Sequence, residues 1–250
     1  AIRKADRVIL AGDHCQLPPT VKSPEALRGG LGNTLMQAIV SNKPDTVSLL
    51  KLQYRMNEEI MRFSSDWFYH GQLRSAPEVK YRGILDFDTP IEWINTEGMD
   101  CNEEFVGENY GRINKQEAEL SVQTLKEYLQ KIGRERILEE RIDVGLISPY
   151  KAQVQYLRQL IKKDTFFKPY RSAITINTVD GFQGQERDVI LISLVRANEE
   201  GQIGFLNDLR RMNVAMTRAR MKLIILGDVS TLTQHPFYRK LYEYIEELNE

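Results

Sequence analysis

The chain has 250 residues, of which 42% are hydrophobic and 28% are charged, and its formal net charge at pH 7 is -1. This composition is typical of a globular protein with a sizeable core. Near-neutrality argues against a protein that binds a polyanion by bulk charge alone, but it permits a local basic groove. No apolar run is long enough to span a membrane and no signal peptide is recognisable, so we expect no membrane partner.

Cysteine and histidine are sparse. The chain has two cysteines and three histidines, and their spacing does not match a zinc site, so we predict no metal site. Sparse cysteine is typical of a reducing compartment, and we expect a cytoplasmic location. The first residue is Ala1 and a strand is expected almost at once, which indicates a cut through a longer protein.

The hydrophobic pattern predicts strands that alternate with helices. Short apolar, β-branched runs predict strands at 8–11, 46–50, 91–94, 143–148, 173–177, 188–195 and 222–227. Apolar residues at helical spacing predict helices over 118–132, 154–161 and 237–248, and Asn114 with Glu117 marks the start of the first. The polar stretches 74–88 and 95–111 are expected to be surface excursions. Such alternation favours a mostly parallel sheet with helices on both faces, whose ligands lie at the carboxyl ends of the strands.

The segment 12–19, GDHCQLPP, follows the first predicted strand. Gly12 permits a tight exit from that strand, and the prolines impose an extended path. Asp13 and Gln16 would then be presented on a stiff loop. An ordinary turn with a capping aspartate explains the segment equally well.

Tyr54 and Arg55 follow the second predicted strand. A tyrosine ring can stack on a nucleotide base while the neighbouring guanidinium reaches a phosphate. A buried tyrosine beside a surface arginine is the simpler alternative.

The segment 178–186, TVDGFQGQE, is a long polar connection between two apolar strands. Gly181 and Gly184 would let backbone amides approach a ligand. Glu186 offers an acceptor for a sugar hydroxyl, and Thr178 offers a donor to a phosphate. A hairpin does not need such a loop, so we favour a functional interpretation.

The segment 210–220, RRMNVAMTRAR, carries four arginines. On a helix, Arg211 and Arg218 would lie about two turns apart on one side. Such a row can bind an anion or form a solvated face.

Taken together, the strings AGDHCQLPPT, LQYRM, ISPYKAQ, VDGFQGQERDVILISLVRAN and GFLNDLRRMNVAMTRAR resemble, in this order, the superfamily 1 helicases related to the nonsense-mediated-decay helicase and the immunoglobulin-mu-binding helicase. The resemblance implies an α/β, RecA-like P-loop NTPase fold. Residues 1–45 would be the C-terminal tail of a first RecA-like domain, and residues 46–250 the second RecA-like domain, without the P-loop.

The resemblance also implies residue roles. Gln16 resembles the residue that senses the γ-phosphate, and Arg55 and Arg218 resemble two arginine fingers. Tyr54 matches the residue that stacks on adenine, and Gly184 and Glu186 belong to the motif beside the nucleotide. The positions that match nucleic-acid contacts are Pro149, Tyr150, Thr178, Ser193, Arg196 and Asn198.

No GxxxxGK[ST] motif occurs in the sequence, and no Asp-Glu pair follows a predicted strand before residue 12. ATP and Mg²⁺ are therefore expected to be held in a full-length protein by a missing N-terminal RecA-like domain, and the chain alone is expected to hold neither and to be inactive. The expected substrate is single-stranded or partly duplex DNA or RNA, with 5′-to-3′ movement. Two alternatives stay open: a non-catalytic nucleic-acid-binding module, and the motor of a nuclease-helicase fusion.

Overall fold

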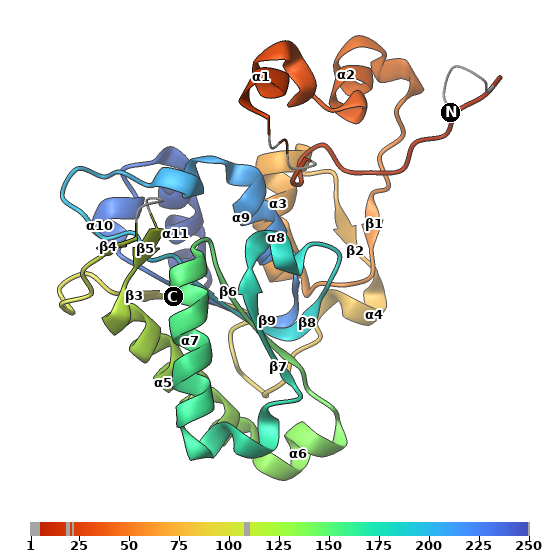
Figure 1. Ribbon diagram of the computed structural model, residues 1–250. Helices are drawn as coiled ribbons and strands as arrows, with labels where there is room; N and C mark the ends of the chain where they lie inside the picture. The colour runs from red at the N-terminus through yellow and green to blue at the C-terminus, as the bar shows by residue number, and fades with distance from the viewer. Residues whose placement is uncertain (1–5, 19–20, 22, 108–110, 250) are drawn as a thin grey trace. The chain divides into compact units, whose positions relative to one another are not determined.

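The computed structural model describes residues 6–18, 21, 23–107 and 111–249 (Figure 1). The chain divides into two compact units, Ala1–Leu50 and Lys51–Glu250. The assignment of residues 1–45 and 46–250 to two RecA-like domains stays a prediction.

The described part of the first unit contains short helices only. They are α1 (Pro24–Ala26), the π-helix η2 (Leu27–Leu31), α2 (Leu35–Asn42) and the 3-10 helix η3 (Pro44–Thr46). The side chains of Ser23 and Thr34 cap α1 and α2 by accepting from Ala26 N and Gln37 N. The strands predicted at 8–11 and 46–50 are wrong, because the described residues there pair with no neighbouring strand. An apolar run without such a partner leaves its backbone groups unpaired and does not form a strand.

The second unit is built on a five-stranded sheet. Its strands are β3 (Ile91–Asn95), β6 (Val144–Ser148), β7 (Ile174–Thr178), β8 (Arg187–Ser193) and β9 (Ala219–Gly227). They lie in the order β3-β9-β8-β6-β7, and every neighbouring pair is parallel. The five strands predicted between residues 91 and 227 are therefore confirmed. So is the predicted α/β, RecA-like fold class.

Helices connect these strands, and Figure 1 shows α7 lying across the sheet. The longer helices are α3 (Glu58–Tyr69), α5 (Lys115–Ile132), α7 (Lys151–Lys163), α9 (Leu209–Met216) and α11 (Pro236–Asn249). The shorter ones are α4 (Pro77–Lys80), α6 (Arg134–Glu139), η4 (Thr165–Tyr170), α8 (Val179–Phe182), η5 (Gly204–Asn207) and α10 (Val229–Leu232). The three helices predicted from periodicity correspond to α5, α7 and α11. Asn114 caps α5 by accepting from Glu117 N at 3.0 Å, as the sequence predicts.

Alternation along the strands shows that both faces of the sheet are covered. Val189 and Leu191 of β8 join a core cluster with the apolar residues of α5 and α7. The residue between them, Ile190, points the other way, since successive strand side chains alternate. On that second face a Cβ at Gly145 would meet Ile190 and Phe182 of α8. Helices α3, α9 and α11 also contact the sheet, with buried residues outside that cluster.

Two small sheets occupy the predicted surface excursions and their surroundings. Strands β1 (Leu52–Gln53) and β2 (Arg74–Ser75) pair in parallel, and β4 (Glu104–Val106) and β5 (Gly111–Ile113) pair antiparallel. Among the described residues, no helix has the length and apolar character needed to cross a membrane.

Candidate functional site

The candidate residues of the second unit gather at two opposite edges of the sheet. Thr178 ends β7 and Ser193 ends β8, at the carboxyl edge. Glu186 and Arg218 directly precede β8 and β9, at the amino edge. Part of the candidate site therefore lies at the edge opposite the one where ligands usually bind in such folds. The connection from β7 to β8 must return to the amino edge because the two strands are parallel, and it carries Glu186 there.

At the amino edge, the structure brings Arg55, Glu186 and Arg218 together around Thr217. Arg55 donates from Nε to Glu186 Oε2 at 2.5 Å and from Nη1 to the carbonyl of Thr217 at 3.0 Å. Arg218 donates from Nη2 to Thr217 Oγ1 and from Nη1 to the carbonyl of Gln185, each at 3.1 Å. Two guanidinium groups thus converge on one short stretch of chain, although 162 positions separate Arg55 from Thr217 in sequence.

The two arginines differ sharply in exposure. The side chain of Arg55 is 32% exposed and that of Glu186 is 40% exposed, whereas Arg218 is 2% exposed. Arg218 also donates from Nε to the carbonyl of Val214 at 3.0 Å. Arg55 is therefore accessible from solvent within its pair with Glu186, while Arg218 is held by interior backbone oxygens.

The helical prediction for Arg218 is wrong. Helix α9 ends at Met216, and Arg218 lies in the turn that leads into β9. The hydroxyl of Thr217 donates to the carbonyl of Asn213 at 2.7 Å, which satisfies a carbonyl of the last helical turn. Arg211 and Arg218 therefore do not form one helical row.

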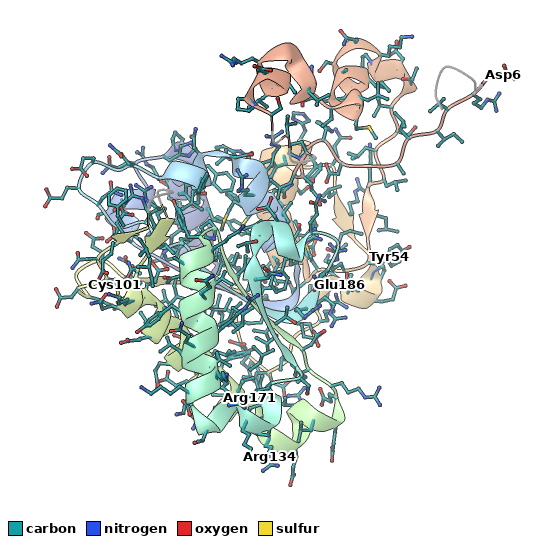
Figure 2. All side chains as sticks on the ribbon, viewed as in Figure 1. Asp6, Tyr54, Cys101, Arg134, Arg171 and Glu186 are labelled. Atoms are coloured by element: carbon teal, nitrogen blue, oxygen red, sulfur yellow. The ribbon has the colours of Figure 1, made fainter. Side chains whose placement is uncertain are left out.

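Gln53 shapes the turn that presents Tyr54 and Arg55. Its Oε1 accepts from the backbone amides of Arg55 and Met56, both at 2.8 Å. Its Nε2 donates to the carbonyl of Met56 and to Ser75 Oγ, also at 2.8 Å. With its backbone fixed in this way, Tyr54 projects outward and is 63% exposed. Figure 2 shows Tyr54 and Glu186 on the same side of the second unit, away from Arg134 and Arg171.

The two glycines of the segment 178–186 are required for different reasons. A Cβ at Gly181 would meet the side chain of Asn177 at 2.4 Å, so the backbone packs closely there. Gly184 has φ +79 and an open surrounding, so only its backbone conformation calls for glycine. Gly184 is exposed and lies two residues before Glu186, beside the amino-edge cluster.

A charged network lies beside the second carboxylate oxygen of Glu186, Oε1, whereas Arg55 contacts Oε2. Arg220 lies 2.8 Å from Asp143, 2.9 Å from Asp188 and 3.7 Å from Glu186. Asp143 and Asp188 each accept from the backbone amide of the other. Burial raises the pKa of Asp188, and Arg220 opposes that rise. Sequence reasoning missed both aspartates, because they come from different strands and no spacing links them.

At the carboxyl edge, three of the predicted nucleic-acid contacts are buried. Ser193 donates from Oγ to Glu117 Oε1 at 2.6 Å and accepts from Gln153 Nε2 at 2.9 Å. Tyr150 and Arg196 are also buried, and Arg196 Nη1 lies 3.5 Å from the Tyr150 hydroxyl. In this structure the three side chains are buried beneath the surface of the carboxyl edge. Their contact with a nucleic-acid strand stays a prediction.

Glu103, which sequence reasoning missed, holds the chain that follows β8. Its carboxylate lies 2.7 Å from Arg196 and 2.7 Å from Arg112. It also accepts from the backbone amide of Ala197 at 3.2 Å and from Asn198 Nδ2 at 3.3 Å. Two predicted contacts, Arg196 and Asn198, are therefore held by one carboxylate from the β4 side.

Glu117 stabilises a strained corner in the same place. Its Oε1 accepts from Val195 N at 2.8 Å as well as from Ser193. Val195 has φ +73, which is unfavourable for a β-branched residue. Burial raises the pKa of Glu117 to about 7, although the hydrogen bonds from Ser193 and Val195 lower it. The corner is therefore built around a buried carboxyl group.

Pro149 and Thr178 complete the carboxyl edge. Both are half-buried. The sheet register pairs Ser148, directly before Pro149, with Thr178. The Thr178 backbone amide donates to Asn177 Oδ1 at 2.9 Å. Pro149 and Thr178 are therefore two predicted nucleic-acid contacts that lie on neighbouring strand ends and remain partly exposed.

The first unit carries Gln16. Gln16 donates from Nε2 to Asp13 Oδ2 at 2.9 Å, and the amide of Cys15 donates to Asp13 Oδ1 at 2.9 Å. Asp13, His14 and Cys15 could offer metal-ligand atoms within 4.8 Å of one another. Burial, with a smaller effect of Asp13, raises the pKa of Cys15 to about 11. We assign no metal there.

A five-stranded parallel sheet with helices on both faces is a RecA-like fold. The family described as an AAA domain matches residues 31–230, and the chain belongs to that family. It is a region of the superfamily 1 helicase type.

Named relatives are similar over nearly the whole chain. An uncharacterized ATP-dependent helicase from Methanocaldococcus jannaschii is 36% identical and is matched over 100% of this chain and 36% of its own length. The DNA polymerase alpha-associated DNA helicase A of Saccharomyces cerevisiae is 36% identical, over 96% of this chain and 37% of its own. The regulator of nonsense transcripts 1 homolog of Drosophila melanogaster is 36% identical, over 97% and 20%.

This chain therefore spans about a third or less of the length of these relatives. A solved C-terminal domain of a possible DNA helicase from a Lactobacillus is also similar, with a TM-score of 0.38, 14% identity and coverage of 70% of this chain and 88% of that one.

Proposed function

We propose that this chain supplies the second motor domain of an ATP-dependent helicase that translocates on DNA or RNA and unwinds it. The observation that carries the proposal is the convergence of Arg55 and Arg218 on Thr217, beside Glu186. A partly exposed guanidinium beside an acceptor for a sugar hydroxyl, on a turn that a second, buried guanidinium fixes, suits a nucleoside triphosphate. A surface that served only nucleic-acid binding would have no need for this arrangement at the edge opposite Thr178.

In this proposal, ATP and Mg²⁺ are held chiefly by a P-loop domain that these residues do not contain. This chain contributes a positively charged side chain and groups that orient the nucleotide. Arg55 leaves Glu186 for a phosphate oxygen and stabilises the charge that develops during phosphoryl transfer. Arg218 acts from its buried position, where it fixes the Gln185–Glu186 backbone and the Thr217 turn. Tyr54 stacks on the base, and the role of Gln16 stays a prediction.

The nucleic-acid strand lies at the other edge in this proposal. Thr178 and Pro149 contact its backbone, and the buried Ser193, Tyr150 and Arg196 support the surface beneath. The nucleotide and the nucleic acid then bind at opposite ends of the same parallel β-strands. Movement of one domain against the other would change both sets of contacts together, which is what translocation requires.

The test is ATP turnover in a protein that joins this chain to its P-loop domain, measured with and without single-stranded DNA and single-stranded RNA. We expect turnover that either or both nucleic acids stimulate, and none from this chain alone. Steady turnover by the chain alone would contradict the division of labour. A joined protein that binds nucleic acid but never hydrolyses ATP would instead support the binding-module alternative.

A further inference from the structure

Phe205 presents an aromatic ring at the carboxyl edge of the sheet. It lies in η5, and it is 54% exposed. Its ring centroid is 5.6 Å from that of Tyr150, the residue directly before α7, at an interplanar angle of 46°. The guanidinium carbon of Arg211 lies 5.8 Å from the centre of the Phe205 ring. The ring therefore has another ring behind it and a cation beside it.

The turn that carries Phe205 is firmly anchored on both sides. Gly204 has φ +56, and a Cβ there would meet Arg196 Nη1 at 2.4 Å and the Tyr150 hydroxyl at 2.9 Å. On the other side Leu206 is buried, and its carbonyl accepts from the Tyr238 hydroxyl at 2.8 Å. Because its neighbours face inward, Phe205 faces solvent on a rigid support and does not belong to the core.

Position connects this ring to the proposed strand contacts. Tyr150 follows Pro149, and Ser148 is the register partner of Thr178. Phe205, Tyr150, Pro149 and Thr178 thus lie along the same edge, above β6 and β7. Arg211 supplies positive charge there, and its side chain is 28% exposed despite its pairing with Asp208 at 3.2 Å.

We propose that Phe205 is a base-stacking residue for a single-stranded nucleic acid that crosses the carboxyl edge, with Tyr150 as its backing ring and Arg211 as the adjacent cation. This inference rests on the proposed function and adds a nucleic-acid contact to those named there. Aromatic rings in such grooves stack on successive bases without regard to sequence. We therefore expect Phe205 to contribute affinity but little base preference.

The experiment measures binding of fluorescent single-stranded DNA and RNA oligonucleotides to the joined protein by anisotropy, over a range of salt concentrations. Phe205→Ala should weaken binding about 5- to 100-fold. It should leave the slope of log affinity against log salt unchanged, because no charge is removed. Arg211→Ala should reduce that slope. Phe87, a fully exposed ring four residues before the start of β3, gives the matched control: Phe87→Ala should bind like the wild type.

A second variant separates stacking from a general effect on folding. Phe205→Trp should retain affinity, and its indole fluorescence should be quenched when the strand binds. An abasic nucleotide at the stacking position should weaken the wild type but not Phe205→Ala. If Phe205→Ala binds as tightly as the wild type, Phe205 does not stack and the proposed function stands. If the wild type binds no nucleic acid at all, the proposed function itself is wrong.

Discussion

Arg55 and Glu186 form an ion pair across 131 positions of sequence, and it links the turn after β1 to the connection that enters β8. Both side chains are partly exposed, so water and anions can compete for them. Glu186 has a second cation in Arg220, at 3.7 Å. If Arg55 leaves Glu186 to bind a phosphate oxygen, Arg220 remains beside Glu186. The Glu186 carboxylate is then still balanced by a positive charge.

Arg55→Ala should abolish most ATP turnover in the joined protein while leaving its stability nearly unchanged. An arginine finger contributes roughly 10³–10⁵ in rate. An exposed ion pair contributes about 1 kcal/mol or less to stability, since solvent screens it. The measurements are steady-state ATP hydrolysis and urea unfolding, with Arg134→Ala, an exposed arginine at the start of α6, as the control. Turnover near the wild-type rate would reject this role for Arg55.

Arg218→Ala should behave differently, because Arg218 is buried and donates to three neighbouring groups. The sequence alone predicts loss of activity with an intact fold for both arginines. The structure revises this for Arg218: truncation removes a donor from the buried carbonyl of Val214 and from the half-buried carbonyl of Gln185, which costs about 2–4 kcal/mol in the free energy of unfolding. Urea unfolding of the two alanine variants side by side tests the difference. Equal midpoints would show that Arg218 is not a structural residue.

Thr178→Val should weaken single-strand binding about fivefold, since one hydrogen bond contributes roughly 1 kcal/mol. Valine keeps the shape of threonine and removes only the hydroxyl, so stability should hardly change. Anisotropy titrations against the wild type give the effect. Thr165→Val, at an exposed position in η4, is the control. An unchanged affinity for Thr178→Val would remove Thr178 from the strand path.

The buried carboxyl group of Glu117 should make stability fall as pH rises. Burial, together with a smaller effect of the negative charge of Asp228, raises its folded-state pKa from 4.5 to about 7. The folded protein therefore binds more protons than the unfolded chain between these two values, and stability decreases across that window by on the order of 3 kcal/mol.

Glu117→Gln should flatten this dependence, because an amide can keep accepting from Ser193 and Val195 without ionising. The free energy of unfolding at a series of pH values from 4.5 to 8, from urea titrations, gives the comparison. Glu127→Gln, at an exposed position of α5, should keep the wild-type profile. A wild-type curve that rises with pH over this range would contradict the assignment.

The central strands could be predicted from sequence because their signal is local. The run 188–195 is apolar except at Asp188 and Ser193, as is typical of a strand buried on both faces. The same rule failed at 8–11 and 46–50, where apolar runs exist but no strand pairs with them. Pairing depends on distant residues, and a window of a few residues does not contain that information.

The site was predictable as a set of residues but not as a geometry. Arg55, Glu186 and Arg218 could be named from motifs, yet their place at the amino edge follows from the direction in which the connection after β7 runs. The motifs also did not predict which side chains are exposed to solvent. Arg218 and Ser193 are buried, whereas Tyr54 and Phe205 are exposed. Glu103 gave no signal, because its partners Arg112, Arg196 and Asn198 come from separate parts of the chain.

Strand β8 begins directly after Glu186 and ends at Ser193, and from Asp188 onward it is buried. Its backbone is bonded on both sides, to β6 and β9. A tightly packed strand cannot stretch or bend much, so it behaves as a stiff lever. The separation between Glu186 and the Val195 corner is therefore nearly fixed, since a buried strand paired on both sides joins them.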